Sequence, residues 1–365
     1  FVAKRTEQGT LITARASSKS GAEVHDLALV TACNLEDLSL DVISTSRKAS
    51  LNASVAHLIF QARPEIQYIV HAHIPLPENV QLIRDTSPST AEDWEYLEPL
   101  VRSGETVIGQ AHHGAMILLE SLDELYPVLQ RNSIYLSNAK HYDVAYSRFL
   151  KSESLVDLLM NEVPLDSAIV DIAAGTGEVS KLMLAKGFSD LTLVDRSPAM
   201  LAVAQEKLGK FVGADRFIEA DMQHLNLEKR FDAAIVRQAI NYLAPENLVS
   251  GFRSLGSTLK PGGKLLFNSF NPETLEERQR RYTREEQEDK ILITHQGNLL
   301  KGRQVLHGQR TEIFDKVTGG YNLVYDMNVF YGYTVEELEG ALREAVAKFV
   351  KIKREDRSIY CVSDW

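Results

Sequence analysis

The sequence contains few cysteines, no long apolar run and no excess of positive charge. Its two cysteines, Cys33 and Cys361, lie far apart, and neither belongs to a cluster that would bind zinc. No apolar stretch approaches the length of a membrane span, and the first residues lack the long apolar core of a signal peptide. We therefore expect a protein of the reducing cytoplasm.

The overall composition is that of an ordinary soluble globular protein, with 44% hydrophobic and 25% charged residues. A net charge of −10 argues against the basic surfaces that bind nucleic acid or anionic membranes. With 365 residues the chain is too long for one ordinary core, so two domains are predicted. The first residue is Phe1 rather than Met, which leaves open whether residues precede it.

Residues 1–137 and 138–365 differ in pattern, and we take them as the two domains. The first part alternates short apolar runs with helical stretches, which predicts an α/β domain. A polar, poorly periodic stretch at 134–141 marks the junction. From about residue 142 a helix, a buried strand, a glycine turn and a helix follow in order, and strands and helices continue to alternate. This order predicts an open, mainly parallel sheet.

The most informative stretch is "DIAAGTG" at 171–177, which joins a buried strand to a helix. Its small residues allow the backbone to approach a ligand closely, and the amino terminus of the helix offers free N–H groups. Asp195 ends the next strand. An acid at that place can accept hydrogen bonds from both hydroxyls of a ribose.

Two further strands end in polar residues. "FIEADMQHL" supplies Asp221, and "FDAAIVRQAINYL" leads to Arg237 and Gln238. In an open α/β sheet the carboxyl ends of the strands face one crevice, where ligands bind. An acid that ends a strand is most often a solvated helix cap, and for Asp221 taken alone this is the favoured interpretation.

Taken together, these motifs closely resemble those of class I S-adenosylmethionine-dependent methyltransferases, over about 138–365. The resemblance implies a Rossmann-like fold in which 171–177 cradles the methionine end of the cofactor, Asp195 holds the ribose, and Asp221 and Met222 border the adenine. Ala173 stands where the family often has its first glycine. The cofactor-binding residues that the resemblance implies are Tyr142, Asp171, Ala173, Gly175, Gly177, Asp195, Arg196, Met200, Asp221, Met222, Arg237 and Gln238.

The motifs do not identify the methyl acceptor. Methyl transfer needs mainly positioning, and a general base is optional. Residues 291–333 show an alternating pattern, which predicts antiparallel strands that form a lid or an acceptor wall. We expect a small molecule as acceptor, acidic or polar because of the arginines, with contacts from one or two of a few residues. The candidates are His295, Arg303, His307, Arg310, Tyr325 and Tyr331.

A second possible site lies in "YIVHAHIPL", where His71 and His73 would point to the same face of a strand. His112 and His113 precede Gly114 further along the chain. Two strand histidines and a third from a nearby strand end can supply three nitrogen ligands to a divalent metal and leave an open side. We expect a metal here, with zinc favoured.

Most of residues 1–135 is similar to class II aldolase/adducin-type domains. The similarity is carried by "ITARAS", "KASLNASVAHLIFQARPEIQYIVHAHIP" and "HHGAMILLESLDELYPVL". It implies a metal triad of His71, His73 and His113. The family usually has a carboxylate four residues before the position of His57, where this chain has Ala53. Enediolate chemistry needs a group that moves the proton, so ordinary aldol cleavage is not expected.

Three hypotheses follow for the whole chain. In the leading one, the second domain methylates a small molecule and the first is a metal-retaining aldolase relative of weak or altered activity. In another, the chain is bifunctional, and a metal-dependent lyase or epimerase step, served by Glu78 or Asp93, feeds the methylation. In the third, the first domain is a non-catalytic oligomerisation module. The aldolase resemblance also implies a homo-oligomer.

Overall fold

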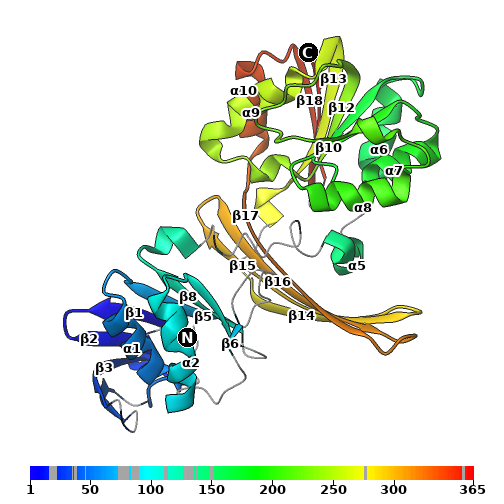
Figure 1. Ribbon diagram of the computed structural model, residues 1–365. Coiled ribbons are helices and arrows are strands. Elements are labelled where there is room, and N and C mark those ends of the chain that lie inside the picture. Colours follow the sequence, from blue (N-terminus) through cyan, green and yellow to red (C-terminus); the bar gives the residue numbers. More distant parts are fainter. Residues whose placement is uncertain are drawn as a thin grey trace. The chain divides into compact units, whose positions relative to one another are not determined.

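The computed structural model describes most of the chain, and within it two compact units, Phe1–Asn132 and Ser133–Trp365 (Figure 1). No helix of the described part is both long and apolar enough to cross a membrane. The described residues are 1–15, 23–34, 36, 39–45, 47–72, 82–83, 90–110, 114–125, 128, 135, 139–147, 152–274, 278–355 and 358–365.

The first unit contains a mixed sheet, and two α-helices of ten or more residues lie among its described residues. The strands are β1 (Val2–Thr6), β2 (Gly9–Thr13), β3 (Leu27–Cys33), β4 (Leu40–Ser44), β5 (Tyr68–Ala72), β6 (Leu82–Ile83), β7 (Val107–Gln110) and β8 (Gly114–Leu119). They lie in the order β4-β3-β2-β1-β5-β8-β7-β6. All described neighbours pair antiparallel except β6 and β7. The helices are α1 (Ala53–Ala62) and α2 (Ala91–Arg102).

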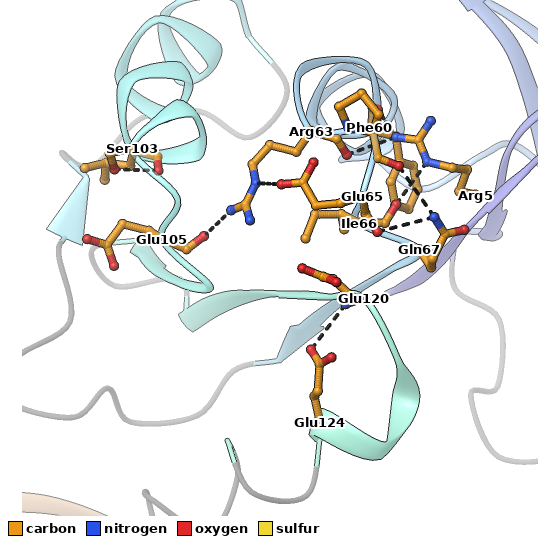
Figure 2. Close-up of polar contacts among 12 residues, drawn as sticks. Arg5, Phe60, Arg63, Glu65, Ile66, Gln67, Ser103, Glu105, Glu120 and Glu124 are labelled. Atoms are coloured by element: carbon orange, nitrogen blue, oxygen red, sulfur yellow. Dashed lines mark hydrogen bonds and ion pairs between the residues drawn. The ribbon is translucent and has the colours of Figure 1, made fainter.

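Helix α1 lies in the core of this unit, with eight of its ten residues buried. The carbonyl groups at its carboxyl end have no partner within the helix, and a cation there also favours the helix dipole. Arg5 of β1 supplies hydrogen-bond donors and a positive charge at this end of the helix. Its guanidinium donates to the carbonyl oxygens of Phe60, Arg63 (3.1 Å) and Ile66 (3.0 Å). Figure 2 shows this guanidinium beside Phe60 and Ile66. The end of α1 is therefore fastened to the first strand.

The second unit is built on a seven-stranded sheet in the order β11-β10-β9-β12-β13-β19-β18. Strands β9 to β13 pair in parallel, and β19 pairs antiparallel with both β13 and β18. The predicted open, mainly parallel sheet is confirmed, and a hairpin of β18 and β19 closes it. The strands are β9 (Ile169–Ile172), β10 (Leu191–Asp195), β11 (Phe217–Glu219), β12 (Phe231–Arg237), β13 (Leu259–Phe270), β18 (Phe349–Arg354) and β19 (Ser358–Asp364).

Both faces of this sheet are covered, which explains why every residue of β9 and β10 is buried. The longer helices are α6 (Glu153–Glu162), α7 (Glu178–Lys186), α8 (Pro198–Leu208), α9 (Leu248–Gly256) and α10 (Val335–Glu344). One core joins Val170 and Ile172 of β9 to α9 and α10. The other joins Ile169 of β9 to α6, α7 and α8. Strand β9 is thus central, and the chain leaves it toward β10 on one side and returns as β12 on the other.

A four-stranded antiparallel sheet follows within the same unit, in the order β14-β15-β16-β17. Its strands are β14 (Arg278–Glu286), β15 (Lys290–Lys301), β16 (Gln304–Asp315) and β17 (Tyr321–Tyr331). The antiparallel strands predicted at 291–333 are therefore confirmed, and β14 adds a strand that the alternation did not indicate.

The contacts of Arg5 predict a stability effect. Arg5→Met removes the guanidinium donor from the carbonyl groups of Phe60 and Ile66, while that of Arg63 still accepts the N–H of Ile66. We therefore expect the free energy of unfolding of the first unit to fall by about 1–3 kcal/mol. Urea denaturation followed by the fluorescence of Trp94, in a Trp365→Phe background, measures this unit. Arg102→Met is the control, because the pair that Arg102 forms with Glu98 is exposed and is expected to contribute less than about 1 kcal/mol. Equal effects of the two changes would contradict the capping role.

Candidate active site

The glycine turn between β9 and α7 has an unusual backbone conformation. Ala173, Gly175 and Gly177 all have positive φ, at 58°, 56° and 79°. A Cβ added at Gly175 would meet no atom within 4 Å, so the space beside this residue is open to a ligand. A Cβ at Gly177 would lie 2.9 Å from Leu208 of α8, so this glycine lets the start of α7 pack closely.

Ala173 carries a cost that a glycine would avoid. The left-handed region costs a non-glycine residue about 1–2 kcal/mol. This alanine stands where the methyltransferase family often has glycine, and its φ has the sign that favours glycine. Strained backbone of this kind concentrates at ligand-binding turns, where the surrounding structure holds it.

Asp195 holds the turn against the end of β10. Its Oδ2 accepts the N–H of Gly175 at 2.8 Å, and its Oδ1 accepts the N–H of Ser197 at 2.8 Å. The carboxylate is nearly buried, and this burial raises its pKa. A carboxylate can accept about four hydrogen bonds in all, so it retains capacity for the two hydroxyls of a ribose.

Asp171, inside β9, has one satisfied oxygen and one unsatisfied oxygen. Oδ2 accepts the hydroxyl of Ser180 at 2.7 Å. Oδ1 is buried and has no hydrogen-bond partner among the described residues. Burial raises the pKa of this carboxyl group to about 7. A cationic donor beside it would satisfy Oδ1 and favour the charged form. The ammonium group of an amino acid is such a donor, so the residues of this turn fit S-adenosylmethionine.

At the third strand end, Asp221 makes a local turn. Its Oδ1 accepts the N–H of Gln223 at 2.9 Å, and its carbonyl oxygen accepts the N–H of His224 at 2.9 Å. These bonds are those of a local turn, with no helix following among the described residues. The contact of Asp221 with adenine stays a prediction. Met222 beside it is partly buried against the core.

The remaining predicted cofactor residues differ in exposure. Arg196 is exposed after β10, whereas Met200 is fully buried in α8 as a core residue. Arg237 ends β12, and its charge lies close enough to oppose the burial-driven rise in the pKa of Tyr142. Gln238 has φ 49°, and its N–H donates to Oδ1 of Asn268 at 2.9 Å.

Tyr142 belongs to a short helix, α5 (Tyr142–Ala145), that contacts the glycine turn. Its neighbour Asp143 accepts the hydroxyl of Thr176 at 2.5 Å and the ammonium of Lys207. The ring of Tyr142 stacks on Tyr146 with centroids 4.9 Å apart. The segment that carries Tyr142, a predicted cofactor residue, thus lies against the turn.

The candidate acceptor residues lie on different faces of the four-stranded sheet. His307 shares a face with Gln309, which donates to the carbonyl oxygen of Ala145 in α5 at 3.2 Å. The even-numbered residues of β16 point to the opposite face of the sheet. On that face Arg310 pairs with Glu312 at 2.9 Å.

The other acceptor candidates do not converge with His307. His295 lies near Glu312, at 4.0 Å, and Tyr325 is the strand partner of Arg310. Arg303 pairs with Glu337 of α10 at 2.6 Å. Tyr331 packs against the core of the main sheet, and its carbonyl oxygen accepts from Asn241. Among the candidates whose side chains the structure describes, His307 alone lies on the face that contacts α5.

The predicted metal site lies largely outside the described residues, which include neither His73, Glu78, His112 nor His113. His71 is buried at the end of β5, and its ring stacks on Phe1 at 5.3 Å. Asp93 is buried in the first turn of α2, and Ala53 is buried at the start of α1. The described part of the chain contains no group of three metal-ligating side chains. The metal triad stays a prediction.

Comparison with known sequences assigns residues 169–263 to a methyltransferase-domain family. YqeM of Bacillus subtilis is 34% identical over 131 residues, which cover 32% of this chain and 52% of that protein. The malonyl-[acyl-carrier protein] O-methyltransferase of Priestia megaterium is 32% identical over 148 residues, 39% of this chain and 51% of that protein. The chain spans about half the length of these curated relatives.

Comparison with solved structures shows the same fold. An S-adenosylmethionine-dependent methyltransferase from Clostridium acetobutylicum matches with a TM-score of 0.53 at 19% identity, over 62% of this chain and 97% of that one. The sugar N-methyltransferase KedS8 from Streptoalloteichus matches with a TM-score of 0.51 at 22% identity, over 61% and 92%.

Residues 169–263 therefore match a methyltransferase domain, and the second unit has the Rossmann-like fold of solved S-adenosylmethionine-dependent methyltransferases, as the motifs predicted. None of these matches is to a class II aldolase or an adducin. That resemblance of residues 1–135 stays a prediction.

The raised pKa of Asp171 predicts a pH dependence of stability. Its folded-state pKa of about 7 lies above the ordinary value of 3.8, so the folded protein binds more protons between these values. The ligand-free unit should lose stability as pH rises from about 4 to about 7. Asp171→Asn cannot ionise, so it should remove this loss and be the more stable form at pH 8, by on the order of 1–3 kcal/mol.

Urea denaturation at pH 5 and pH 8, followed by the fluorescence of Trp365, measures the effect. Asp190→Asn is a control at the amino end of β10, where Asp190 pairs with Lys229 at 2.7 Å near the surface. An unchanged pH dependence in Asp171→Asn would show that this carboxyl group is not the source.

Proposed function

We propose that the second unit transfers the methyl group of S-adenosylmethionine to a small-molecule acceptor. The observation that supports this most strongly is the open glycine turn held by Asp195, beside the unsatisfied Oδ1 of Asp171. When bound, the cofactor supplies an electrophilic methyl group on a sulfonium. The first acid accepts from ribose hydroxyls, and the second balances the ammonium of the methionine end.

The rest of the site positions and encloses the reactants. Transfer is an in-line displacement, so it is accelerated mainly by orientation and by exclusion of water. Helix α5 lies against the turn on one side and against the four-stranded sheet on the other, through Thr176 and Gln309. Acceptor contacts that come from one short helix and one sheet face suit a small molecule. Some relatives are named for action on malonyl-[acyl-carrier protein], and we take from them only the methyl-transfer chemistry.

We further propose that His71, with His73 and His113, binds a divalent metal in the first unit, with zinc favoured. The histidine spacing supports this proposal, and Ala53 in place of the expected carboxylate supports weak or altered aldolase-type activity. A bifunctional enzyme and a non-catalytic oligomerisation module are the alternatives. A homo-oligomer, a cytoplasmic location and the lack of nucleic-acid and membrane partners also stay proposals.

Cofactor binding tests the role of Asp195. Asp195→Ala removes two charged hydrogen bonds to the ribose, so the dissociation constant for S-adenosylmethionine in isothermal titration calorimetry should rise about 100-fold or more. Asp190→Ala changes an acid at the opposite end of the same strand and should leave the affinity unaltered. Similar affinity of the wild type and Asp195→Ala would refute the cofactor site.

Metal content tests the first unit. Protein purified without chelators should contain a divalent metal by mass spectrometry, and His71→Ala should lose most of it while its affinity for S-adenosylhomocysteine stays the same. His25→Ala, which changes a half-exposed histidine of the same unit, should retain the metal. Equal metal content in all three proteins, or none in the wild type, would contradict the triad.

A further inference from the structure

Three charged side chains from three helices converge beside the glycine turn. Asp143 belongs to α5, Glu178 is the first residue of α7, and Lys207 lies in the last turn of α8. The ammonium of Lys207 donates to Oδ2 of Asp143 and, at 2.6 Å, to Oε1 of Glu178. The other carboxylate oxygen of Asp143 accepts the hydroxyl of Thr176, a residue of the turn, at 2.5 Å. These four residues are called the clasp below.

Two of the three charges are placed by their own helices, independently of α5. The first turn of a helix favours an acid and the last turn favours a base, so Glu178 and Lys207 suit their positions. Their side chains are 25% and 22% exposed, so solvent screens this pair less than a fully exposed one. Val179 of α7 and Leu208 of α8 belong to one core. The pair is therefore a fixed point to which a further acid can attach.

Helix α5 depends on attachments of this kind. It has four residues, and a single helical turn is not stable alone because helix nucleation is unfavourable. Toward the four-stranded sheet, Ala145 packs with Leu292 and Ile313, and its carbonyl oxygen accepts from Gln309. Toward the glycine turn, the bonds of Asp143 fasten it. The position of α5 against the turn therefore depends on the clasp.

Lys207 also keeps two acids from repelling each other. The carboxylates of Asp143 and Glu178 both lie within hydrogen-bonding distance of its ammonium. Without that positive charge, two negative charges would face each other at close range, which is unfavourable for both. Loss of Lys207 would therefore repel α5 from the start of α7 as well as remove a bond.

We propose that Lys207 is a positioning residue for the cofactor, because it holds α5 against the glycine turn through Asp143. This inference rests on the proposed methyl transfer. Thr176 follows Gly175, and the space beside Gly175 is open to a ligand. Tyr142, a predicted cofactor residue, precedes Asp143 in α5. The closed clasp keeps Tyr142 at the cofactor turn, and its opening releases the nucleoside product.

A clasp of this kind affects the two rates of ligand exchange differently. A bound nucleoside leaves when α5 moves away from the turn, and this movement breaks the bonds of Asp143 to Thr176 and Lys207. Weaker bonds raise the dissociation rate constant. Association stays at least as fast, because a ligand enters through the open form. Damage to the folded pocket would instead slow association.

Surface plasmon resonance on the immobilised full chain, with S-adenosylhomocysteine as the probe, measures both rate constants. Lys207→Met should raise the dissociation rate constant about tenfold, as expected for the loss of a hydrogen bond between charged groups. Its association rate constant should be no lower than that of the wild type. Lys207→Arg keeps the positive charge, so it should dissociate more slowly than Lys207→Met.

Lys181→Met is the matched control. Lys181 pairs with Glu178 at 3.8 Å and its side chain is 62% exposed, so this variant removes a lysine from the same acid and leaves the bonds of Asp143 in place. It should keep both wild-type rate constants. Asp143→Asn should itself raise the dissociation rate constant. The double variant Asp143→Asn/Lys207→Met should dissociate no faster than Lys207→Met, because Lys207 acts through Asp143.

Hydrogen–deuterium exchange of the ligand-free chain provides a readout that needs no cofactor. The amide of Tyr146 donates to the carbonyl oxygen of Tyr142 in α5 at 2.9 Å. Peptides that contain this amide should exchange faster in Lys207→Met than in the wild type or in Lys181→Met, because the released helix opens more often.

The outcomes separate the clasp from the proposed function. Failure of S-adenosylhomocysteine to bind the wild type overturns the methyl transfer. Binding with equal dissociation rate constants in the wild type and Lys207→Met overturns the clasp, and so does equal acceleration in Lys181→Met or slower association in Lys207→Met. Where Lys207→Met fails to fold, Asp143→Asn changes a side chain that is 31% exposed, and an unchanged dissociation rate constant there overturns the clasp.

Discussion

The second unit depends on the carboxylate of Asp195, which accepts one backbone N–H from the glycine turn and one from the start of the next helix. The bond from Gly175 connects the ends of the adjacent parallel strands β9 and β10, and the bond from Ser197 fixes the turn from β10 to α8. They hold Ala173 and Gly175 in a left-handed conformation that an unsupported loop would leave. The open space beside Gly175 follows from that conformation, and with it the place where a cofactor can meet the backbone.

The short helix α5 connects the glycine turn to the four-stranded sheet of the same unit. Asp143 binds Thr176 of the turn, while Tyr146 and Ala145 bind Asp326 and Gln309 of the four-stranded sheet. A polar centre on a sheet face is costly unless its groups are paired. The short helix provides part of that pairing and leaves one acceptor atom, Oε1 of Gln309, without a described partner. The segment that covers the cofactor turn is therefore also the segment that would shape the acceptor site.

The sequence predicted the parallel sheet, the glycine turn and the antiparallel strands, because hydrophobic period and turn residues are local signals. It did not predict Asp143, Lys207, Gln309 or Asp326, since their contacts depend on strand register and on packing between distant segments. The alternation of apolar and polar residues in β15 and β16 distinguishes the two faces of the sheet, but it does not indicate which face α5 covers. The sequence therefore predicted His295 and Arg310 as acceptor contacts together with His307. In the first unit the sequence pattern indicated helices and strands, while the mainly antiparallel pairing emerged only from the structure.

The central claim is that the turn at 173–177 and Asp195 bind opposite ends of one nucleoside. A crystal structure of the full chain with S-adenosylhomocysteine tests it most directly. Our account predicts the amino-acid end against the backbone of Gly175, with its ammonium near Oδ1 of Asp171, and both ribose hydroxyls on the carboxylate of Asp195. Density for the nucleoside elsewhere on the chain, with these carboxylate oxygens unchanged in their contacts, would contradict the account.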